Sequence, residues 1–426
     1  MSANKITDLI HHPYQPPEGF EAPQIGVHKA STVIFPNVAA MRSRDWKNKS
    51  GYTYGLHGTP TTFTLEERIA SLEGGLQCVL VPSGLAAIVA VDIALLGQGD
   101  DMLLPHNVYG ARLGLTQEEL PRFGITTRYY DAMDAADLAA KITPKTKLVW
   151  LEAPGSVTME FPDLPALVRI CREKAVICAL DNTWGAGLAF NAFDLDGQGL
   201  TVDISSQALT KYPSGGGDVL MGSIVTRDEA LHHKIKLSHM RLGYGVAAND
   251  AELVLRSLPS IGIRYRAADQ SARQLAHWLK TRPEVEAVLH PAIEGAPGHQ
   301  NWQNLCRKRP VAGIESARSA TDLIANEHRS EGYAAGLFSI VFHEKFSPSQ
   351  VDAFVDALKL FKIGYSWGGH LSLAVPYDIA SMRNQNVAHW PYRGGLVRFS
   401  IGFEEAADLM QDLSQAFHAL TKLREN

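Results

Sequence analysis

The 426-residue sequence has few cysteines and no long hydrophobic run. Its four cysteines contain no C-x-x-C pair, and their number and spacing exclude a disulfide framework and a zinc knuckle. The longest apolar stretch, 85–96, is interrupted by Asp92 and is shorter than the roughly 20 residues that cross a bilayer. The first 15 residues lack the basic-then-apolar pattern of a secretion signal. We therefore expect a cytoplasmic protein with no membrane partner.

A large excess of charge of one sign is also absent. The chain has 40 Lys and Arg against 45 Asp and Glu, a formal charge of −5, and its basic residues are scattered. A basic stripe is typical of nucleic-acid-binding proteins, so no nucleic-acid partner is expected. The histidine pairs His11-His12 and His232-His233 have no acidic or cysteine frame, and no metal site is expected. Any strong anion site must therefore be local.

The 45% apolar content is that of a folded protein with a large core, and the length allows about two or three domains. Residues 1–60 are rich in Pro, His, Asn and Thr with little periodicity, which indicates an extended arm. Residues 61–256 alternate helices with short apolar strands, which we place at 78–81, 101–105, 125–130, 147–152, 176–181 and 202–206. This alternation predicts an α/β domain whose mostly parallel sheet is covered by helices on both faces.

Residues 257–426 have a different character, with long amphipathic helices. Their apolar residues recur at helical spacing, in Ala272, Leu275, Ala276 and Leu279 and again in Leu409, Leu413, Phe417 and Leu420. We expect these helices to cover a second, smaller sheet in an α+β C-terminal domain. The polar, charge-rich segment 306–334 within it predicts a solvated surface excursion.

Chemically useful residues follow three of the predicted strands. Asp181 ends one strand, Lys211 follows another, and Ser83-Gly84-Leu85 follows a third at the start of a helix. Since ligands bind where the strands of an open parallel sheet end, an acid, an amine and helix amides are expected to face one crevice. Each residue alone also fits a turn, a solvated side chain or an ordinary helix cap. Their common placement favours a site.

This set matches the requirements of pyridoxal phosphate. The cofactor needs a lysine amine for its Schiff base, a carboxylate that keeps the pyridine nitrogen protonated, and amides for the phosphate. A helix N-terminus offers free N–H groups and the positive end of the helix dipole to a phosphate dianion. Pyridoxal phosphate is therefore the expected cofactor.

Several short motifs occur in a characteristic order along the chain: Tyr54-Gly55, Gly58-Thr59-Pro60-Thr61, Leu72-Glu73-Gly74-Gly75, Ser83-Gly84-Leu85-Ala86-Ala87, Asp181-Asn182-Thr183-Trp184, Thr210-Lys211-Tyr212 and Tyr365-Ser366-Trp367-Gly368-Gly369. Together they resemble the Cys/Met-metabolism pyridoxal-phosphate enzymes, from about residue 25 to about residue 415. Within that family the chain is most similar to the bacterial cystathionine β-lyases. The resemblance implies fold type I, with a mostly parallel, seven-stranded sheet covered by helices.

The resemblance implies roles for three residues at the cofactor. Lys211 forms the Schiff base and, once released by substrate, moves the Cα proton. Asp181 pairs with the pyridinium nitrogen, so that the ring accepts electrons. Tyr109 stacks on the cofactor ring and assists proton transfer.

For the phosphate, the resemblance implies the amides of Gly84 and Leu85 and the hydroxyl of Thr210. Tyr54 is implied to reach the cofactor and the substrate from a neighbouring subunit, which requires at least a dimer. The position two residues after that tyrosine is usually arginine in the family, whereas this chain has Leu56 followed by His57. Either His57 or another cation compensates, or the phosphate is held with less charge neutralisation.

For the substrate, the resemblance implies that Arg398 grips the amino-acid carboxylate through a bidentate fork, with Ser366 and Trp367 beside it. A glutamate commonly replaces Ser366 in relatives that carry out γ-elimination, so this residue favours β-elimination. The implied reaction cleaves the Cβ–S bond of cystathionine or a similar small amino-acid thioether, in methionine biosynthesis. The alternatives are a γ-lyase, γ-synthase or O-acylhomoserine sulfhydrylase, and a noncatalytic cofactor-binding protein. The family also implies a dimer of dimers.

Overall fold

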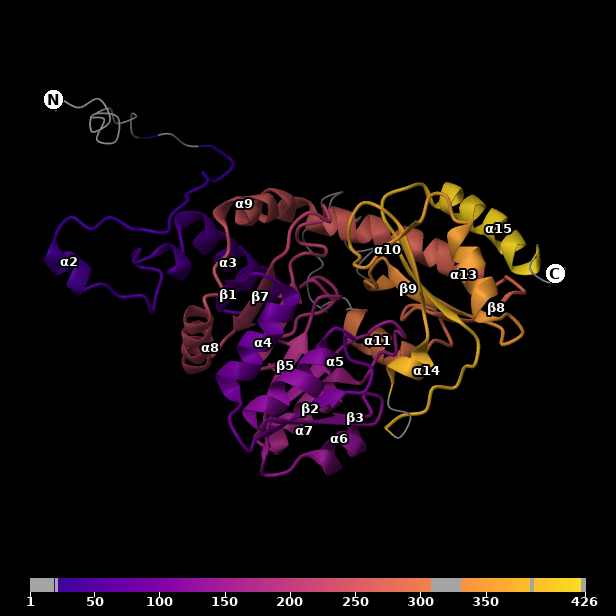
Figure 1. The fold of residues 1–426 in the computed structure, drawn as a ribbon, viewed down its shortest axis with the longest axis horizontal. Helices are drawn as coiled ribbons and strands as arrows, with labels where there is room; N and C mark the ends of the chain where they lie inside the picture. The colour runs from indigo at the N-terminus through magenta and orange to yellow at the C-terminus, as the bar shows by residue number, and fades with distance from the viewer. Residues whose placement is uncertain (1–18, 20–21, 308–330, 384–386, 423–426) are drawn as a thin grey trace, which may run out of the picture.

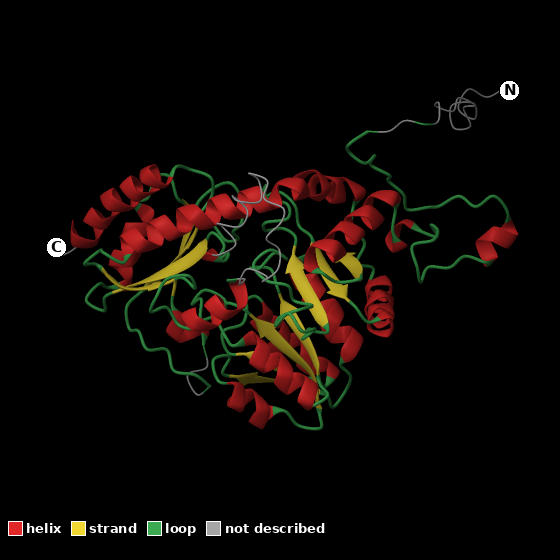
Figure 2. Cartoon of the chain, turned by 180° about the vertical axis from the view of Figure 1, so that it is seen from behind, coloured by secondary structure: helices red, strands yellow, loops and turns green. Residues whose placement is uncertain are grey.

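The computed structural model describes residues 19, 22–307, 331–383 and 387–422. The chain forms two sheets from different parts of the sequence, and Figures 1 and 2 show one sheet in each half of the molecule. Residues 308–330 of the predicted surface excursion at 306–334 lie outside the described residues. Within the described ranges, no helix combines the length and the apolarity that a bilayer crossing requires.

The first sheet has seven strands in the order β1-β7-β6-β5-β4-β2-β3. Every neighbouring pair is parallel except the two that involve β7. The strands are β1 (Gln77–Val81), β2 (Asp101–Pro105), β3 (Thr126–Tyr130), β4 (Thr146–Glu152), β5 (Ile177–Asp181), β6 (Ile204–Ala208) and β7 (Gly222–Thr226). The predicted mostly parallel α/β fold is confirmed.

Two details of this sheet differ from the prediction. The strand expected at 202–206 runs from Ile204 to Ala208, so Thr210 and Lys211 follow its end almost directly. β7 was not predicted, because its apolar signal consists of Ile224 and Val225 between small polar residues. It inserts between β1 and β6 and is antiparallel to both.

Helices bury both faces of the first sheet, and successive residues of β1 show this alternation. Val79 and Val81 belong to the core on the side of α4 and α8, while Cys78 and Leu80 belong to the core on the other side. The main helices are α3 (Pro60–Glu73), α4 (Gly84–Leu95), α6 (Ala135–Lys141), α7 (Leu164–Glu173), α8 (Glu229–Leu242) and α9 (Ala248–Ser257). Shorter helical segments are α5 (Arg112–Gly114), η2 (Leu115–Glu119), η3 (Leu120–Phe123) and η4 (Leu258–Ser260).

The second sheet has five strands in the order β10-β11-β12-β9-β8. These are β8 (Val285–Leu289), β9 (Leu337–Phe342), β10 (Lys362–Ile363), β11 (Leu373–Tyr377) and β12 (Leu396–Ser400). The helices that pack with it are α10 (Ile261–Leu279), α13 (Pro348–Asp356) and α15 (Ala406–Lys422). Two further helices, α11 (His299–Cys306) and α14 (Ile379–Met382), bury their apolar residues in the other core, with the first sheet. The predicted apolar stripes of α10 and α15 are buried in one core with this sheet, as expected.

Residues 22–59 form an arm with two short helices, α2 (Val38–Arg42) and η1 (Gly55–His57). Figure 1 shows the arm extending away from both sheets. Few bonds tie it to the body, among them the hydrogen bond from the His28 amide to Thr61 Oγ1 at 2.8 Å. The boundaries at residues 60 and 256 stay predictions, which the positions of the two sheets support.

Candidate active site

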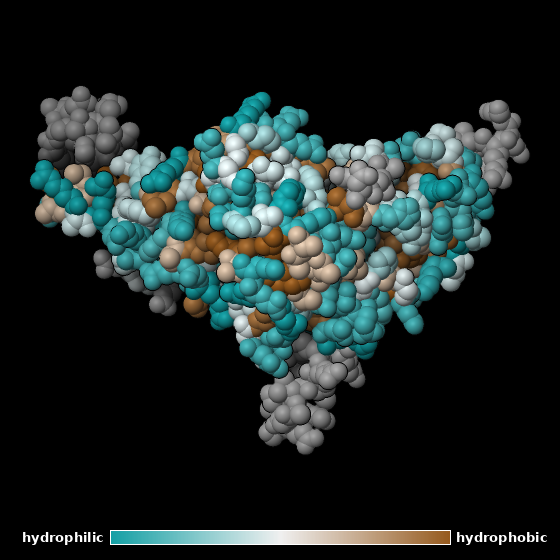
Figure 3. Space-filling view, turned by 90° about the horizontal axis from the view of Figure 1, so that it is seen from below, coloured by the Kyte–Doolittle hydropathy of each residue, from teal (hydrophilic) through white to brown (hydrophobic). Residues whose placement is uncertain are grey.

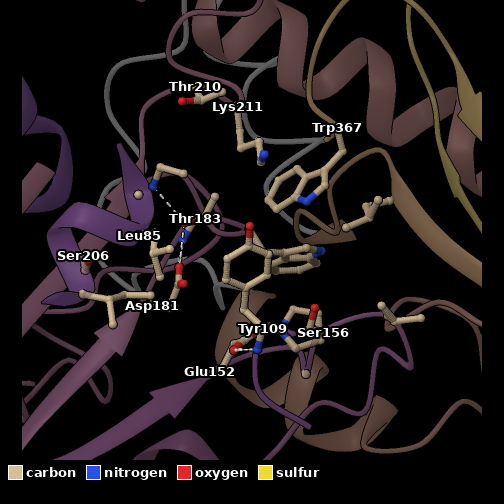
Figure 4. A pocket seen from close by; sticks show the side chains of 18 of the residues that line it. Leu85, Tyr109, Glu152, Ser156, Asp181, Thr183, Ser206, Thr210, Lys211 and Trp367 are labelled. Carbon is tan, nitrogen blue, oxygen red and sulfur yellow. Dashed lines mark hydrogen bonds between the residues drawn. The ribbon is translucent and has the colours of Figure 1, made fainter. Parts of the chain in front are cut away.

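One cavity at the carboxyl ends of the first sheet's strands gathers most of the predicted site residues. Gly84, Leu85, Tyr109, Asp181, Thr210, Lys211, Trp367 and Arg398 all line it. Ser366 contacts Lys211 at its edge, and Tyr54 lies elsewhere. Figure 4 shows Tyr109, Lys211 and Trp367 pointing into the cavity from separate segments. The structure thus brings together an amine, a carboxylate, an arginine and a helix N-terminus.

Lys211 is held at the centre of the cavity. Its Nζ donates to Ser366 Oγ at 2.8 Å and lies 5.6 Å from the centre of the Trp367 ring. Burial and the nearby Arg398 lower the pKa of Lys211 to about 8, and Asp181 opposes the shift. About a tenth of this amine is therefore uncharged at pH 7, far more than for an ordinary lysine, and the neutral form is the one that acts as nucleophile or base.

An unusual turn places Ser366 beside Lys211. Ser366 has φ +94° and Gly368 has φ +78°, both in the left-handed region that side chains other than glycine rarely adopt. A Cβ on Gly368 would also lie 3.0 Å from the Tyr212 amide nitrogen. The turn directs the Ser366 hydroxyl to Lys211 and its carbonyl oxygen to Arg398 Nη2 at 3.4 Å. Strain at such a position is typical of functional sites.

Asp181 ends β5 with its side chain in the cavity. Its Oδ1 accepts hydrogen bonds from Thr183 Oγ1 at 2.6 Å and from the Thr183 amide at 3.0 Å. Thr183 Oγ1 in turn accepts a hydrogen bond from the Ala208 amide at 2.9 Å, which ties Thr183 and Asp181 to β6. Burial raises the pKa of Asp181, and the hydrogen bonds from Thr183 oppose that shift. A cationic nitrogen placed against this carboxylate would favour its ionised form.

The N-terminus of α4 forms an anion cradle. Ser83 caps the helix by accepting the Ala86 amide at 3.0 Å, while the amides of Gly84 and Leu85 have no acceptor within the helix. Gly84 is required because a Cβ there would lie 2.6 Å from the Ala208 Cβ. Thr210 also lines the cavity, but its hydroxyl donates to the Met221 carbonyl and accepts the Met221 amide. Its predicted contact with the phosphate stays a prediction.

Tyr109 enters the cavity from the loop after β2. Its amide donates to Glu152 Oε2 at 3.0 Å, which fixes the backbone at this residue. Burial raises the pKa of Tyr109, and Asp181 and Glu152 raise it further. The phenol therefore carries its proton at neutral pH and can donate a hydrogen bond.

Arg398 lies in the middle of β12 and is 7% exposed. Its guanidinium carbon lies 5.2 Å from the centre of the Tyr377 ring, and the two side chains also form a hydrogen bond. On the neighbouring strand β11, Val375 pairs with Arg398, and Tyr377 lies two pairs further along, opposite Leu396. A buried guanidinium at a cavity wall is suited to a carboxylate ligand.

Tyr54 and the residues after it do not reach the cavity of their own chain. Tyr54 is 47% exposed, and Leu56 and His57 line a different, small pocket together with Lys236 and His239. Burial, Lys236 and Arg44 lower the pKa of His57. Whether His57, another cation or weaker charge neutralisation serves at the phosphate stays a prediction. The contact of Tyr54 with a neighbouring subunit stays a prediction.

Some residues at the cavity were not identified from the sequence, including Glu152 and Ser156, and Thr183 and Trp184 were recognised only as part of a motif. Glu152 could have been found, because it ends a predicted strand, as Asp181 does, and the two face each other in register. Burial and the neighbouring Asp181 raise the pKa of Glu152 well above its ordinary value. Burial thus favours the neutral form of this carboxyl group.

The side chains present fit pyridoxal phosphate. Lys211 offers an amine of lowered pKa, Asp181 offers a buried carboxylate, and α4 offers the free N-terminal amides of Gly84 and Leu85. Among the described residues, no group of three or more His, Cys, Asp or Glu side chains could hold a metal ion. Organic-cofactor chemistry at Lys211 is thus what this donor set can perform.

Comparison with known proteins agrees with this geometry. The chain is 36% identical over 428 residues to the cystathionine beta-lyase of Bordetella avium, covering 97% of this chain and 98% of the relative. It is 34% identical to cystathionine beta-lyase MetC of Escherichia coli, covering 92% of each. The crystal structure of metB from Corynebacterium glutamicum superposes with a TM-score of 0.79 at 25% identity, covering 97% of each chain. The family model of Cys/Met metabolism PLP-dependent enzymes matches residues 6–418, and the chain belongs to that family.

Proposed function

We propose that the protein is a cystathionine β-lyase, a carbon–sulfur lyase that eliminates a thiol from Cβ of L-cystathionine. With one water consumed, the products are homocysteine, pyruvate and ammonia. The observation that carries the proposal is the position of the Lys211 amine, hydrogen-bonded to Ser366 and within one cavity with Asp181 and Arg398. The relatives named cystathionine beta-lyase support this choice of reaction. The activity fits a place in methionine biosynthesis.

Substrate orientation is assigned to the C-terminal part of the chain. Arg398 binds the α-carboxylate, because a buried guanidinium forms paired hydrogen bonds with it. Trp367 limits the space beside Lys211, with its ring 5.6 Å from Nζ. This fixes Cα near the amine and excludes water from one side of it.

Proton transfer is assigned to Lys211. Pyridoxal phosphate, when bound, supplies an electron sink for negative charge that develops at Cα. Asp181 preserves a positive charge at the ring nitrogen, and the amides of Gly84 and Leu85 hold the phosphate. The Lys211 amine, with a pKa of about 8, takes the Cα proton while Ser366 Oγ directs it. Tyr109 carries its proton and assists proton transfer to the leaving thiolate.

The working form is proposed to be at least a dimer, and a dimer of dimers by family likeness, in the cytoplasm. Leu220 lines the cavity yet is 72% exposed, and Tyr365 beside Ser366 is 82% exposed. Figure 3 shows apolar residues gathered at the centre of one face. Exposed apolar surface at a cavity mouth is expected where a second subunit covers it. Tyr54 in the extended arm then completes the neighbour's site.

The test is thiol release from L-cystathionine by the purified protein loaded with pyridoxal phosphate. Lys211→Ala should abolish turnover and the visible absorbance of the bound cofactor, while Arg398→Met should mainly weaken substrate binding. Turnover of an O-acyl-homoserine without thiol release from cystathionine would instead assign the protein to the sulfhydrylases or synthases. A wild-type protein that stays colourless with added cofactor would contradict the proposed lyase and support a noncatalytic role.

A further inference from the structure

A fully buried ion pair is linked to the cavity residue Tyr109 and is not used by the proposed chemistry. Arg112 is 1% exposed and Asp92 is 0% exposed, and Arg112 Nη2 donates to both carboxylate oxygens at 3.0 and 2.9 Å. Asp92 lies inside the otherwise apolar helix α4. Apolar residues of similar size often stabilise a core as well as a buried ion pair does. Stability alone therefore does not explain the pair.

The backbone of Arg112 is bonded directly to Tyr109. The Arg112 amide donates to the Tyr109 carbonyl oxygen at 3.0 Å, which closes a tight turn over residues 109–112. On its other side, the Tyr109 amide donates to Glu152 Oε2 at 3.0 Å. Both polar backbone groups of Tyr109 are thus fixed, one by β4 and one by Arg112. The position of the Tyr109 ring depends on both anchors.

The side chain of Arg112 connects this turn to the sheet and to α4. Its guanidinium carbon lies 4.3 Å from the centre of the Trp150 ring, and Trp150 Nε1 donates to Asp92 Oδ1 at 2.8 Å. Trp150 precedes Glu152 by two residues in β4. The contacts therefore form a closed circuit from Tyr109 through Arg112, Asp92 and Trp150 to Glu152 and back to Tyr109.

The circuit also reaches the anion cradle. Asp92 lies on α4, the helix whose first amides, those of Gly84 and Leu85, form the cradle. A rigid connection between this helix and Tyr109 would hold two sides of the cofactor site at a fixed separation. We propose that Arg112 is a positioning residue, whose buried ion pair with Asp92 sets the place of Tyr109 relative to helix α4. This role rests on the proposed function, in which Tyr109 acts at the cofactor.

The test removes the pair without leaving a buried charge. In the double variant Asp92→Asn with Arg112→Met, the amide oxygen of Asn still accepts the Trp150 indole. The control is the double variant Asp101→Asn with Arg128→Met. It removes another ion pair of the same sheet, with a distance of 2.9 Å, at the start of β2 and thus at the end of the strands opposite the cavity. We expect the first variant to lower kcat about tenfold or more with little change in KM, and the control to change neither by more than about twofold.

Two further readouts separate positioning from general damage. The visible circular dichroism of the bound cofactor should change in the Asp92/Arg112 variant and stay as in the wild type in the control. In a Tyr109→Ala background, the same pair of substitutions should cost no more than about twofold in kcat, because its effect acts through Tyr109. An equal loss of kcat in both backgrounds, or unchanged dichroism with normal kcat, would overturn the proposal.

If the double variant does not fold, Arg112→Lys replaces it, since this substitution keeps the charge but removes the guanidinium plane on Trp150. The loss of kcat that it causes is then compared between the wild-type and the Tyr109→Ala backgrounds. Turnover is measured with whichever thioether the wild type cleaves. A wild type without activity would count against the proposed lyase, whereas the dichroism of the variants would still test the role of Arg112.

Discussion

At the scale of single residues, the lowered pKa of Lys211 predicts how the cofactor-free protein takes up pyridoxal phosphate. The rate of covalent uptake should rise with pH through about 8, because only the neutral amine attacks the aldehyde. Arg398→Met should move this midpoint upward, since Arg398 is the main charge that lowers it. Stopped-flow absorbance measures the rate, with Arg128→Met as a distant control. A midpoint near the ordinary value of 10.5 in the wild type would contradict the assignment.

A second residue, Glu73, predicts a pH dependence of stability. It is fully buried and accepts hydrogen bonds from Asn182 Nδ2 at 2.9 Å and Ser205 Oγ at 2.6 Å. Burial raises its pKa to about 7, from 4.5, against the lowering by those hydrogen bonds. Because the folded state favours the protonated form, the contribution of Glu73 to stability is present below pH 4.5 and lost as pH rises through about 7.

The loss amounts to about 3 kcal/mol for a shift of this size. Glu73→Gln keeps an acceptor for both partners and does not titrate, so the variant should gain stability relative to the wild type as pH rises from about 4.5 to about 8. Denaturant unfolding of both proteins across this range measures the difference. A difference that stays constant with pH would refute the assignment to Glu73.

The residues that could be predicted from the sequence are those with a direct role at the ligand. Lys211 follows one predicted strand and Asp181 ends another, while Arg398 was implied by the family resemblance, and the three meet in one cavity. Glu73 was recognised only as part of a motif, and Arg112 was not identified. Both residues matter because they are buried and because they bond to residues distant in the sequence. Neither property can be seen from the spacing of residues in the sequence.

At the scale of elements, the contact between α4 and β6 predicts that Gly84 does not tolerate a side chain. The Cβ of Gly84→Ala would overlap Ala208, and the helix N-terminus would have to move away from the strand. Overpacking of this kind costs about 1–3 kcal/mol. We expect weaker cofactor binding, measured by fluorescence titration of the apo-protein. Gly97→Ala, after the other end of α4, has its nearest neighbour at 3.6 Å and should bind normally.

The elements themselves were predicted where the apolar pattern is long or is followed by a clear break. Strand β2 and the apolar stripes of α10 and α15 agree with expectation, and the other predicted strands shift by at most two residues at either end. β7 could not be predicted, because Gly222, Ser223 and Thr226 hide its pattern. Those small residues suit a central strand: a Cβ on Gly222 would lie 2.3 Å from the Ser83 carbonyl oxygen.

At the scale of the whole molecule, the extended arm predicts active sites shared between subunits. Lys211→Ala and Tyr54→Ala should each be nearly inactive alone. A mixture of equal amounts, unfolded and refolded together, should recover about one quarter of wild-type activity, because about half of the dimers are mixed and one of the two sites in each mixed dimer has both wild-type residues. Absence of any recovery, with mixed dimers verified by mass spectrometry, would mean that Tyr54 does not serve a neighbouring site.

Composition and periodicity predict a division of the chain into an arm, a cofactor-binding part and a smaller C-terminal part, and this division stays a prediction. What the sequence could not supply is how these parts meet. Lys211 follows a strand of the first sheet, whereas Arg398 belongs to a strand of the second. Ser366, which has a positive φ, contacts both: its hydroxyl accepts from Lys211 Nζ at 2.8 Å and its carbonyl oxygen accepts from Arg398 Nη2 at 3.4 Å. Such long-range contacts depend on the packing of both sheets.

The central claim, β-elimination at a site built on Lys211, is tested most directly by identifying the keto acid formed from L-cystathionine. Mass spectrometry of the products of the cofactor-loaded wild type should find pyruvate and homocysteine in equal amounts, with none formed by Lys211→Ala. Formation of 2-oxobutyrate and cysteine instead would contradict the claim, because those products require cleavage on the other side of the sulfur.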